Sequence, residues 1–213
     1  MSKKINEILL KLARINEDAS EEMAEGIDGL FLDSIHLRAF IQSIEAVNNR
    51  DFSKSFLCLS LGAGTTYAVI MKICKLYDRA KDYKLNSLRE VWKKAPLKDK
   101  KESELITKEF DTGNENSIFK SIIRYRDKVL AHNEQNFSIS WQEIDKTLSF
   151  FSRVWFLVGQ HSESAIMFPF YDFKNVSGCF DKLFSNQEIR EANTAWNNYI
   201  NSIKLSMQKE YNS

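Results

Sequence analysis

The scarcity of turn-forming residues is the feature that most constrains the fold of this chain. Only 7 glycines and 2 prolines occur among its 213 residues. Because these residues mark most tight turns, their scarcity favours long helices joined by few connections. Apolar residues recur at the three- and four-residue spacing of amphipathic helices, and no alternating pattern of useful length predicts a strand. The sequence therefore predicts an all-α fold, a helical bundle with an additional helical segment at its C-terminal end.

The apolar spacing predicts a series of helices separated by short breaks. They cover about residues 5–15, 30–47, 52–79, 87–94, 117 to between 132 and 136, 141–159 and 187–209. Ser140 and Glu143 form the capping-box pattern that marks a helix start. The charge-dominated segment 98–108 is expected to be a solvated helix or loop, and residues 165–186 are expected to be irregular.

The chain length favours one domain, in which we distinguish two parts. Residues 1–160 are predicted to form the helical bundle, and residues 161–213 an aromatic-rich extension whose helix packs on that bundle. Phenylalanines are frequent in the extension, and core packing is the expected role for most of them. These are Phe168, Phe170, Phe173, Phe180 and Phe184.

A run without charged residues extends from Phe56 to Ile70. The run is shorter than the roughly 20 residues that a membrane-spanning helix needs, and it contains several polar and small residues. It therefore predicts a buried central helix of a protein without a membrane partner. Gly62, Ala63 and Gly64 would allow another helix to pack closely on it.

Charge and cysteine content exclude several classes of protein. The formal net charge is +1, so any nucleic-acid site must be local. The three cysteines include no CxxC pair, which argues against a disulfide framework and against a zinc site. No metal or cofactor is implied, and a reducing cytoplasm is the simplest location.

Arg126, Asp127 and His132 bring together the groups that can cleave RNA without a metal. A guanidinium binds phosphate oxygens and stabilises the negative charge that they gain in the transition state. A histidine can donate or accept a proton near neutral pH. Attack by the 2′-hydroxyl of RNA would give a 2′,3′-cyclic phosphate and a 5′-hydroxyl.

The six-residue separation of Arg126 and His132 corresponds to about 240° on a regular helix, so the two would not share a face. We therefore expect the helix to end or bend before His132. One histidine cannot conveniently act as both acid and base, and a two-fold homodimer would supply the second. Asp127 could orient either His132 or Arg126, or raise the pKa of the histidine.

Residues around this segment could bind RNA. The candidates are Lys120, Arg124 and Lys128, which would attract phosphates, and Tyr125, which could stack on a base. A solvated face is the commoner role of such basic residues, and packing is the commoner role of a tyrosine. His36 is expected to be a surface residue or a core residue with its hydrogen bonds satisfied, and His161 is expected at a helix end, where the helix dipole favours a histidine.

The segment Arg126-Asp127-x4-His132 resembles the R-polar-x4-H signature of HEPN domains. The longer string from Arg126 to Glu134 resembles the R-x-K-x-x-A-H form of the AbiU-like branch, as do the flanking segments 72–78 with 87–88, and 139–144. The resemblance covers about residues 27–159. It implies a helical bundle that dimerises, often with ribonuclease activity in toxins or phage defence. It extends to the roles of Arg126, Asp127 and His132 only.

Three hypotheses follow. The first is a metal-independent endoribonuclease, a toxin or phage-defence effector that works as a homodimer on RNA and has an antitoxin protein as a potential partner. The second is a non-catalytic HEPN module that binds a partner protein or a nucleotide. The third is an unrelated helical bundle in which Arg126 pairs with Asp127 or Glu134 and His132 braces a helix end.

Overall fold

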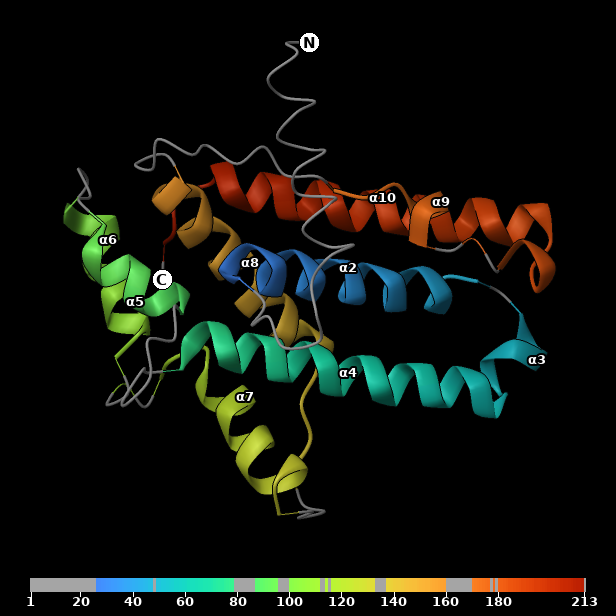
Figure 1. The fold of residues 1–213 in the computed structure, drawn as a ribbon, viewed down its shortest axis with the longest axis horizontal. Helices are drawn as coiled ribbons and strands as arrows, with labels where there is room; N and C mark the ends of the chain where they lie inside the picture. Colours follow the sequence, from blue (N-terminus) through green and yellow to red (C-terminus); the bar gives the residue numbers. More distant parts are fainter. Residues whose placement is uncertain are drawn as a thin grey trace, which may run out of the picture.

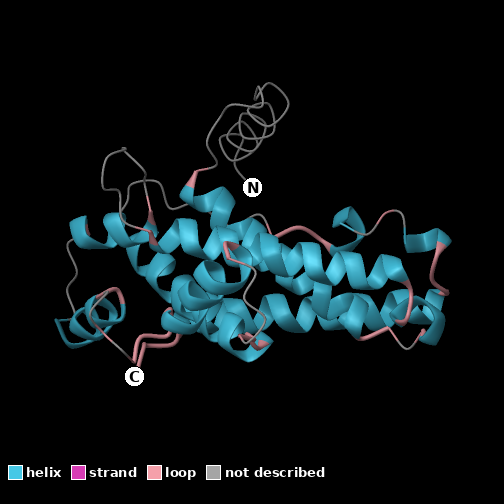
Figure 2. Ribbon diagram, turned by 90° about the horizontal axis from the view of Figure 1, so that it is seen from below, coloured by secondary structure: helices cyan, strands magenta, loops and turns pink. Residues whose placement is uncertain are grey.

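The computed structural model describes residues 26–47, 49–78, 87–95, 100–111, 114, 116–132, 137–159, 170–176, 178 and 180–212. All regular structure in these ranges is helical, and they contain no strand, which confirms the all-α prediction (Figure 2). The helix expected over residues 5–15 and the residue His161 lie outside the described ranges.

The helices follow the predicted series with several differences. Short helices occur at Phe173–Val176 and Phe180–Lys182, within the segment expected to be irregular, and the helix expected from residue 117 to between 132 and 136 runs from Lys120 to Leu130. Their bounds are α2 Ile27–Glu45, α3 Arg50–Ser53, α4 Phe56–Tyr77, α5 Leu88–Lys94, α6 Lys100–Glu109, α7 Lys120–Tyr125, the π-helix η1 Arg126–Leu130, α8 Trp141–Gly159, α9 Phe173–Val176, the 3₁₀-helix η2 Phe180–Lys182 and α10 Asn186–Gln208.

Serine caps set the starts of several helices. The Ser140 hydroxyl accepts a hydrogen bond from the Glu143 backbone N–H at 3.2 Å, and the Glu143 carboxylate accepts one from the Ser140 N–H at 2.8 Å. This is the predicted capping box at the start of α8. Ser185 forms the same arrangement with Glu188 at the start of α10. These side chains satisfy backbone donors that a helix start leaves without partners.

The long helices α4, α2 and α10 lie side by side, with α2 between the other two (Figure 1). α8 packs against α10 and α5, and α7 projects away from the body beyond α4. The core between these helices is rich in aromatic side chains, including the fully buried Phe31, Phe151 and Trp196. The all-helical layers therefore enclose one continuous hydrophobic core.

The C-terminal helix α10 is part of this core. It packs against both α2 and α8. Phe173, Phe180 and Phe184 are buried, and Phe170 packs against the core from a partly buried position, which confirms the expected packing role. Phe168 lies outside the described residues. The division of the chain at residue 160 stays a prediction.

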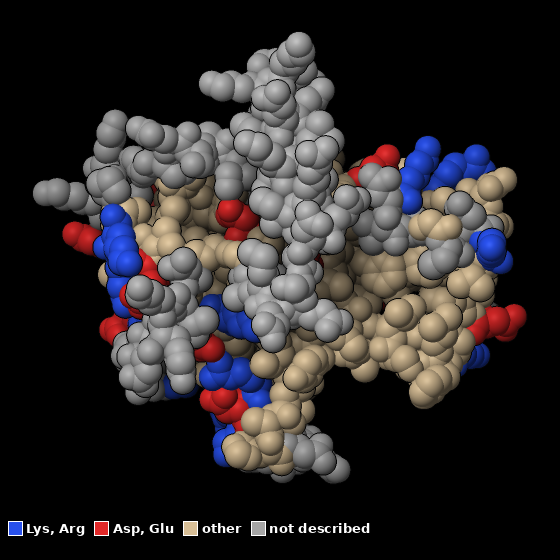
Figure 3. Space-filling view, viewed as in Figure 1, with Lys and Arg blue, Asp and Glu red and all other residues tan. Residues whose placement is uncertain are grey.

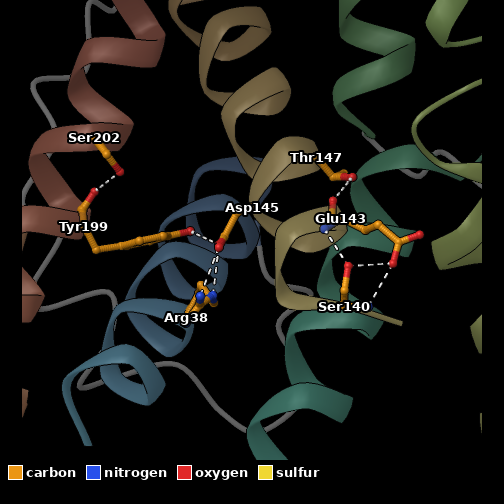
Figure 4. A network of polar contacts seen from close by, with 7 residues as sticks. All are labelled: Arg38, Ser140, Glu143, Asp145, Thr147, Tyr199 and Ser202. Carbon is orange, nitrogen blue, oxygen red and sulfur yellow. Dashed lines mark hydrogen bonds and ion pairs between the residues drawn. The ribbon is translucent and has the colours of Figure 1, made fainter. Parts of the chain in front are cut away.

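A buried polar network joins the three helices of the core. Arg38 of α2 donates two hydrogen bonds of 2.9 Å to the Asp145 carboxylate of α8, and the Tyr199 hydroxyl of α10 donates to the same carboxylate at 3.1 Å (Figure 4). The Arg38 guanidinium also lies 4.5 Å from the centre of the Trp141 ring. The network fixes the first turns of α8, directly after the segment that contains His132.

The structure corrects the prediction for the uncharged run. The helix expected over 52–79 is divided, because Ser55 caps a new start and accepts a hydrogen bond from the Cys58 N–H at 3.1 Å. Its burial is confined to the half that begins at Thr65, so α2 and not α4 is the central helix. Among the described residues, α4 is a helix long and apolar enough to cross a membrane by length and composition.

The prediction that segment 98–108 is a solvated helix or loop was only partly correct. It forms α6, and Glu102 within it is buried rather than solvated. The Glu102 carboxylate pairs with Arg153 of α8 at 2.7 Å and accepts a hydrogen bond from the Tyr211 backbone N–H at 2.8 Å. A long-range ion pair, which composition does not reveal, therefore holds α6 against the bundle.

Candidate functional site

Arg126 begins a π-helical turn in the middle of the projecting helix. α7 ends at Tyr125, and η1 continues to Leu130 with a hydrogen bond of 2.9 Å from the Ala131 N–H to the Arg126 carbonyl. His132 follows in a turn. The prediction that the helix ends before His132 is confirmed. The π turn was not predicted, and such turns occur frequently at functional sites.

Two carboxylates hold the Arg126 guanidinium. Its Nε donates to Asp127 at 2.8 Å, and Nη1 donates to both oxygens of Asp78 at 3.0 and 3.2 Å. The Arg126 side chain is one quarter exposed, at 25%. Partial burial acts to lower the pKa of Arg126, but the hydrogen bond to Asp127, the neighbouring Cys74 and Asp78 together raise it above its usual value. The guanidinium is therefore held in place and fully charged.

Asp78 is the site residue that the sequence analysis did not identify. It is the C-cap of α4, 48 residues before Arg126 in the chain. A negative charge at a helix C-terminus is unfavourable with the helix dipole unless a cation is near. The position of this acid directly after a long helix was a weak signal that it has a distant basic partner.

Cys74 lies one turn before Asp78 on the same helix and is buried. Burial raises the pKa of this thiol to about 12, and the nearby Arg126 opposes the rise only in part. Because the thiolate is the reactive form of cysteine, Cys74 is not a candidate nucleophile at neutral pH.

His132 is exposed, and its imidazole makes no hydrogen bond within the described part of the chain. Asp127 contacts Arg126, as expected if Asp127 orients the arginine rather than the histidine. Arg126 and His132 are not joined by a hydrogen bond in the described structure. Glu134, the other suggested partner of Arg126, lies outside the described residues.

The predicted RNA-binding residues border two hollows beside α7. The larger has a volume of about 350 Å³ and includes Lys120, Arg124, Asp127 and Lys128 in its lining. The smaller, of about 310 Å³, lies against Tyr125, and it shares Lys120 and Arg124. Basic and acidic side chains are intermingled where α7 joins the body (Figure 3). The four predicted residues thus lie along these two adjoining hollows, whose linings include Asp127 but neither Arg126 nor His132.

Two of these residues also have packing contacts. The Arg124 guanidinium lies 4.1 Å from the centre of the Phe137 ring, a cation–π contact. Tyr125 is partly buried against the hydrophobic core, which agrees with its expected packing role. Lys120 and Lys128 are both exposed.

The other described histidine, His36, is structural, as expected. It is stacked on Trp196, with ring centres 5.8 Å apart, and its Nε2 accepts a hydrogen bond from the Tyr171 backbone N–H at 3.3 Å. Burial lowers the pKa of His36 to about 4. In the described part of the chain, no group of three or more His, Cys, Asp and Glu residues could hold a metal ion.

The model of one protein family, HEPN AbiU2, matches residues 59–177. This match covers more than half of the chain and includes Asp78, Arg126 and His132. It begins later than the resemblance found in the sequence and continues past α8 as far as the residue after α9. No curated protein and no solved structure matches the chain. The matched region contains the entire candidate site. The chain therefore belongs to the AbiU2 family of HEPN domains.

Proposed function

We propose that this protein is a metal-independent endoribonuclease that acts as a homodimer in phage defence or as a toxin. The observation that carries the proposal is the arrangement around the π turn: a charged guanidinium held by Asp78 and Asp127, followed by an exposed histidine. Its membership of an abortive-infection HEPN family supports the same function. RNA would be the substrate, an antitoxin protein a further partner, and the cytoplasm the site of action.

Arg126 would stabilise the reacting phosphate. Negative charge grows on the phosphoryl oxygens as the 2′-oxygen attacks, and a guanidinium fixed before the reaction lowers the energy of that state without reorganising. Asp127 is a positioning residue in this scheme, because it binds Nε of Arg126 and limits rotation of the side chain. Asp78 holds the same guanidinium from α4.

His132 would transfer the protons. One imidazole accepts the 2′-hydroxyl proton while the 2′-oxygen forms a bond to phosphorus. The bond from phosphorus to the 5′-oxygen breaks, and a second imidazole, in its protonated form, donates a proton to that oxygen. A two-fold dimer supplies both histidines, and its products are a 2′,3′-cyclic phosphate and a 5′-hydroxyl.

The hollows beside α7 would hold the RNA next to the reacting bond. The ammonium groups of Lys120 and Lys128 would attract the backbone phosphates, and Arg124 would add a third positive charge at their border. This contribution is electrostatic, so RNA binding should weaken as salt concentration rises.

The substitution His132→Ala tests the assignment. We expect RNA cleavage to fall to background, while far-UV circular dichroism and the melting temperature stay unchanged because the side chain is exposed. Asn198→Ala, at an exposed position of α10, is the matched control and should cleave like the wild type. Cleavage in excess chelator and a 2′,3′-cyclic phosphate end are also expected. Undiminished cleavage by His132→Ala would refute the catalytic role.

A non-catalytic HEPN module is the alternative function. The observation in its favour is that two of the Arg126 nitrogens are already bound to carboxylates, so a phosphate must share or displace those contacts. This alternative predicts nucleotide or protein binding that depends on Arg126 but no turnover of RNA by the purified wild type.

A further inference from the structure

The first half of α4 presents a bare apolar surface. Most of the large hydrophobic side chains that are exposed in the described chain lie here: Phe56 is 85% exposed, Leu59 65%, Tyr67 51% and Leu57 48%. A typical monomer seldom leaves a contiguous apolar patch of this kind to water unless a partner covers it. We call the face formed by Phe56, Leu57, Leu59, Ser60, Ala63, Gly64 and Tyr67 the α4 outer face.

These residues share one side of the helix. At about 100° per residue, they fall within an arc of roughly 160°. The buried Thr65, Val69 and Leu76 lie on the opposite side of α4, as does Lys72, which pairs with Asp33 of α2. A side chain added at Gly64 would meet nothing within 4 Å. Small residues in the middle of the face therefore leave room for another helix to approach closely.

The α4 outer face leads directly to the candidate site. By the same angular count, Cys74 and Asp78 lie on this side of α4 near its C-terminal end, where η1 and Arg126 cover the helix. The projecting α7 lies beside the C-terminal half of α4 (Figure 1), and the bare first half of α4 carries no charged side chain. A partner on the bare half would therefore bind the same side of α4 as the segment that contains Arg126.

A second copy of the chain is the occupant that this chemistry favours. A two-fold contact brings each residue close to its own symmetry mate, so a charged face repels itself whereas an uncharged one does not. No acidic or basic residue occurs from Phe56 to Met71. The four large side chains expose roughly 500 Å² per copy, so a contact that covered them fully on both copies would bury roughly 1,000 Å², which is the lower limit for a specific interface.

We infer that the α4 outer face is the surface through which two copies of this protein associate. The inference assigns a surface to the homodimer of the proposed function, and it rests on that proposal only for the consequence at Arg126 and His132. A membrane-spanning position of α4 does not fit the structure, because the opposite side of α4 is fixed to α2, in part by the Lys72–Asp33 ion pair of 3.1 Å.

Sedimentation velocity of the full-length protein tests the inference with a matched pair of variants. Leu59→Glu places a charge in the centre of the face, whereas Leu205→Glu changes an equally exposed leucine, at 66%, on α10. We expect a dimer for the wild type and for Leu205→Glu. Leu59→Glu should raise the dimer dissociation constant about 100-fold or more, because like charges then meet in an apolar contact. Unchanged melting temperatures would show that the variants are folded.

A cross-link identifies the contact directly. With Cys58 and Cys179 replaced by serine, Ser60→Cys should form an intermolecular disulfide on mild oxidation, and a cysteine at exposed Ser202 of α10 should not. A monomeric wild type, or a dimer that Leu59→Glu leaves intact, would overturn the inference. So would a monomer that binds neutral lipid vesicles through this face.

Ribonuclease assays keep this inference separate from the proposed function. A dimer that dissociates with Leu59→Glu but never cleaves RNA would refute the proposed function alone. Conversely, RNA cleavage that depends on His132 and is unaffected by Leu59→Glu would refute the α4 interface alone.

Discussion

Arg38 and Arg126 each bind an aspartate from another helix, but they do so in different surroundings. The Arg38 side chain is 6% exposed, binds Asp145 through two nitrogens and lies against aromatic rings. Arg126 is more exposed, and its partners Asp78 and Asp127 are both about half exposed. The first pair connects core helices, and the second holds a guanidinium at the surface.

The difference separates a structural arginine from one available to a ligand. Nη1 of Arg38 finds no hydrogen-bond partner among the described residues, yet it is sealed from solvent, so no substrate can reach it. Removing one partner of such a buried pair leaves an unpaired charge in the interior, which lowers stability strongly. Water screens the charges of a partly exposed pair, so the loss of one partner has a smaller effect. The two sites should therefore respond to substitution in opposite ways, one through stability and one through activity.

The largest expected effect is on the buried pair. Asp145→Ala should lower the free energy of unfolding by about 3–5 kcal/mol, because it leaves Arg38 charged and unpaired and removes the acceptor of the Tyr199 hydroxyl. Urea denaturation measures the change. Asp127→Ala is the control at the exposed pair and should cost less than about 1 kcal/mol. Equal losses in the two variants would contradict the contrast.

At the surface site, Arg126→Lys should impair activity without unfolding the protein. Lysine retains the charge but not the planar fork that binds a phosphate and two carboxylates together. We expect RNA cleavage to fall by about 10²–10³-fold and the free energy of unfolding to change by less than about 1 kcal/mol. Single-turnover cleavage and urea denaturation measure the two quantities. If the variant cleaves RNA normally, the role of Arg126 is structural, like that of Arg38.

The interior near Arg38 should also be sensitive to pH through His36. Its pKa is about 4 in the folded protein, below the ordinary 6.5. The unfolded chain therefore binds a proton that the folded protein does not, and stability, complete above pH 6.5, should fall as pH decreases from about 6.5 to 4. The loss should reach roughly 2–3 kcal/mol.

Denaturation at a series of pH values tests this linkage. His36→Gln keeps a hydrogen-bond acceptor but removes the titrating group, so its stability should change less over the same window. If wild type and variant lose stability in parallel, carboxylates rather than His36 are responsible.

Local patterns predicted much of this structure. The Ser140–Glu143 cap depends on residues three apart, and the end of the helix before His132 follows from the angle between two residues of one helix. The pairing of Arg126 with Asp127 was equally predictable, because the two residues are neighbours in the sequence.

Features that depend on distant contacts were not visible. The partnership of Arg126 with Asp78 joins positions 48 residues apart, and nothing near either residue specifies the other. The exposure of Phe56 and Leu59 was not predicted for a related reason. The apolar pattern of a helix does not show whether its side chains are buried by other parts of the same chain. The π turn depends on how η1 fits against α4.

The π turn changes the angle through which the chain passes between Arg126 and Ala131. A turn closed by a bond from residue 131 to residue 126 holds one residue more than an ordinary helical turn. Because that extra residue is taken up within the turn, the segment advances by less than the 100° per residue of a regular helix, so six residues do not give the 240° of six regular steps. The direction in which the chain leaves toward His132 therefore depends on the width of one backbone turn.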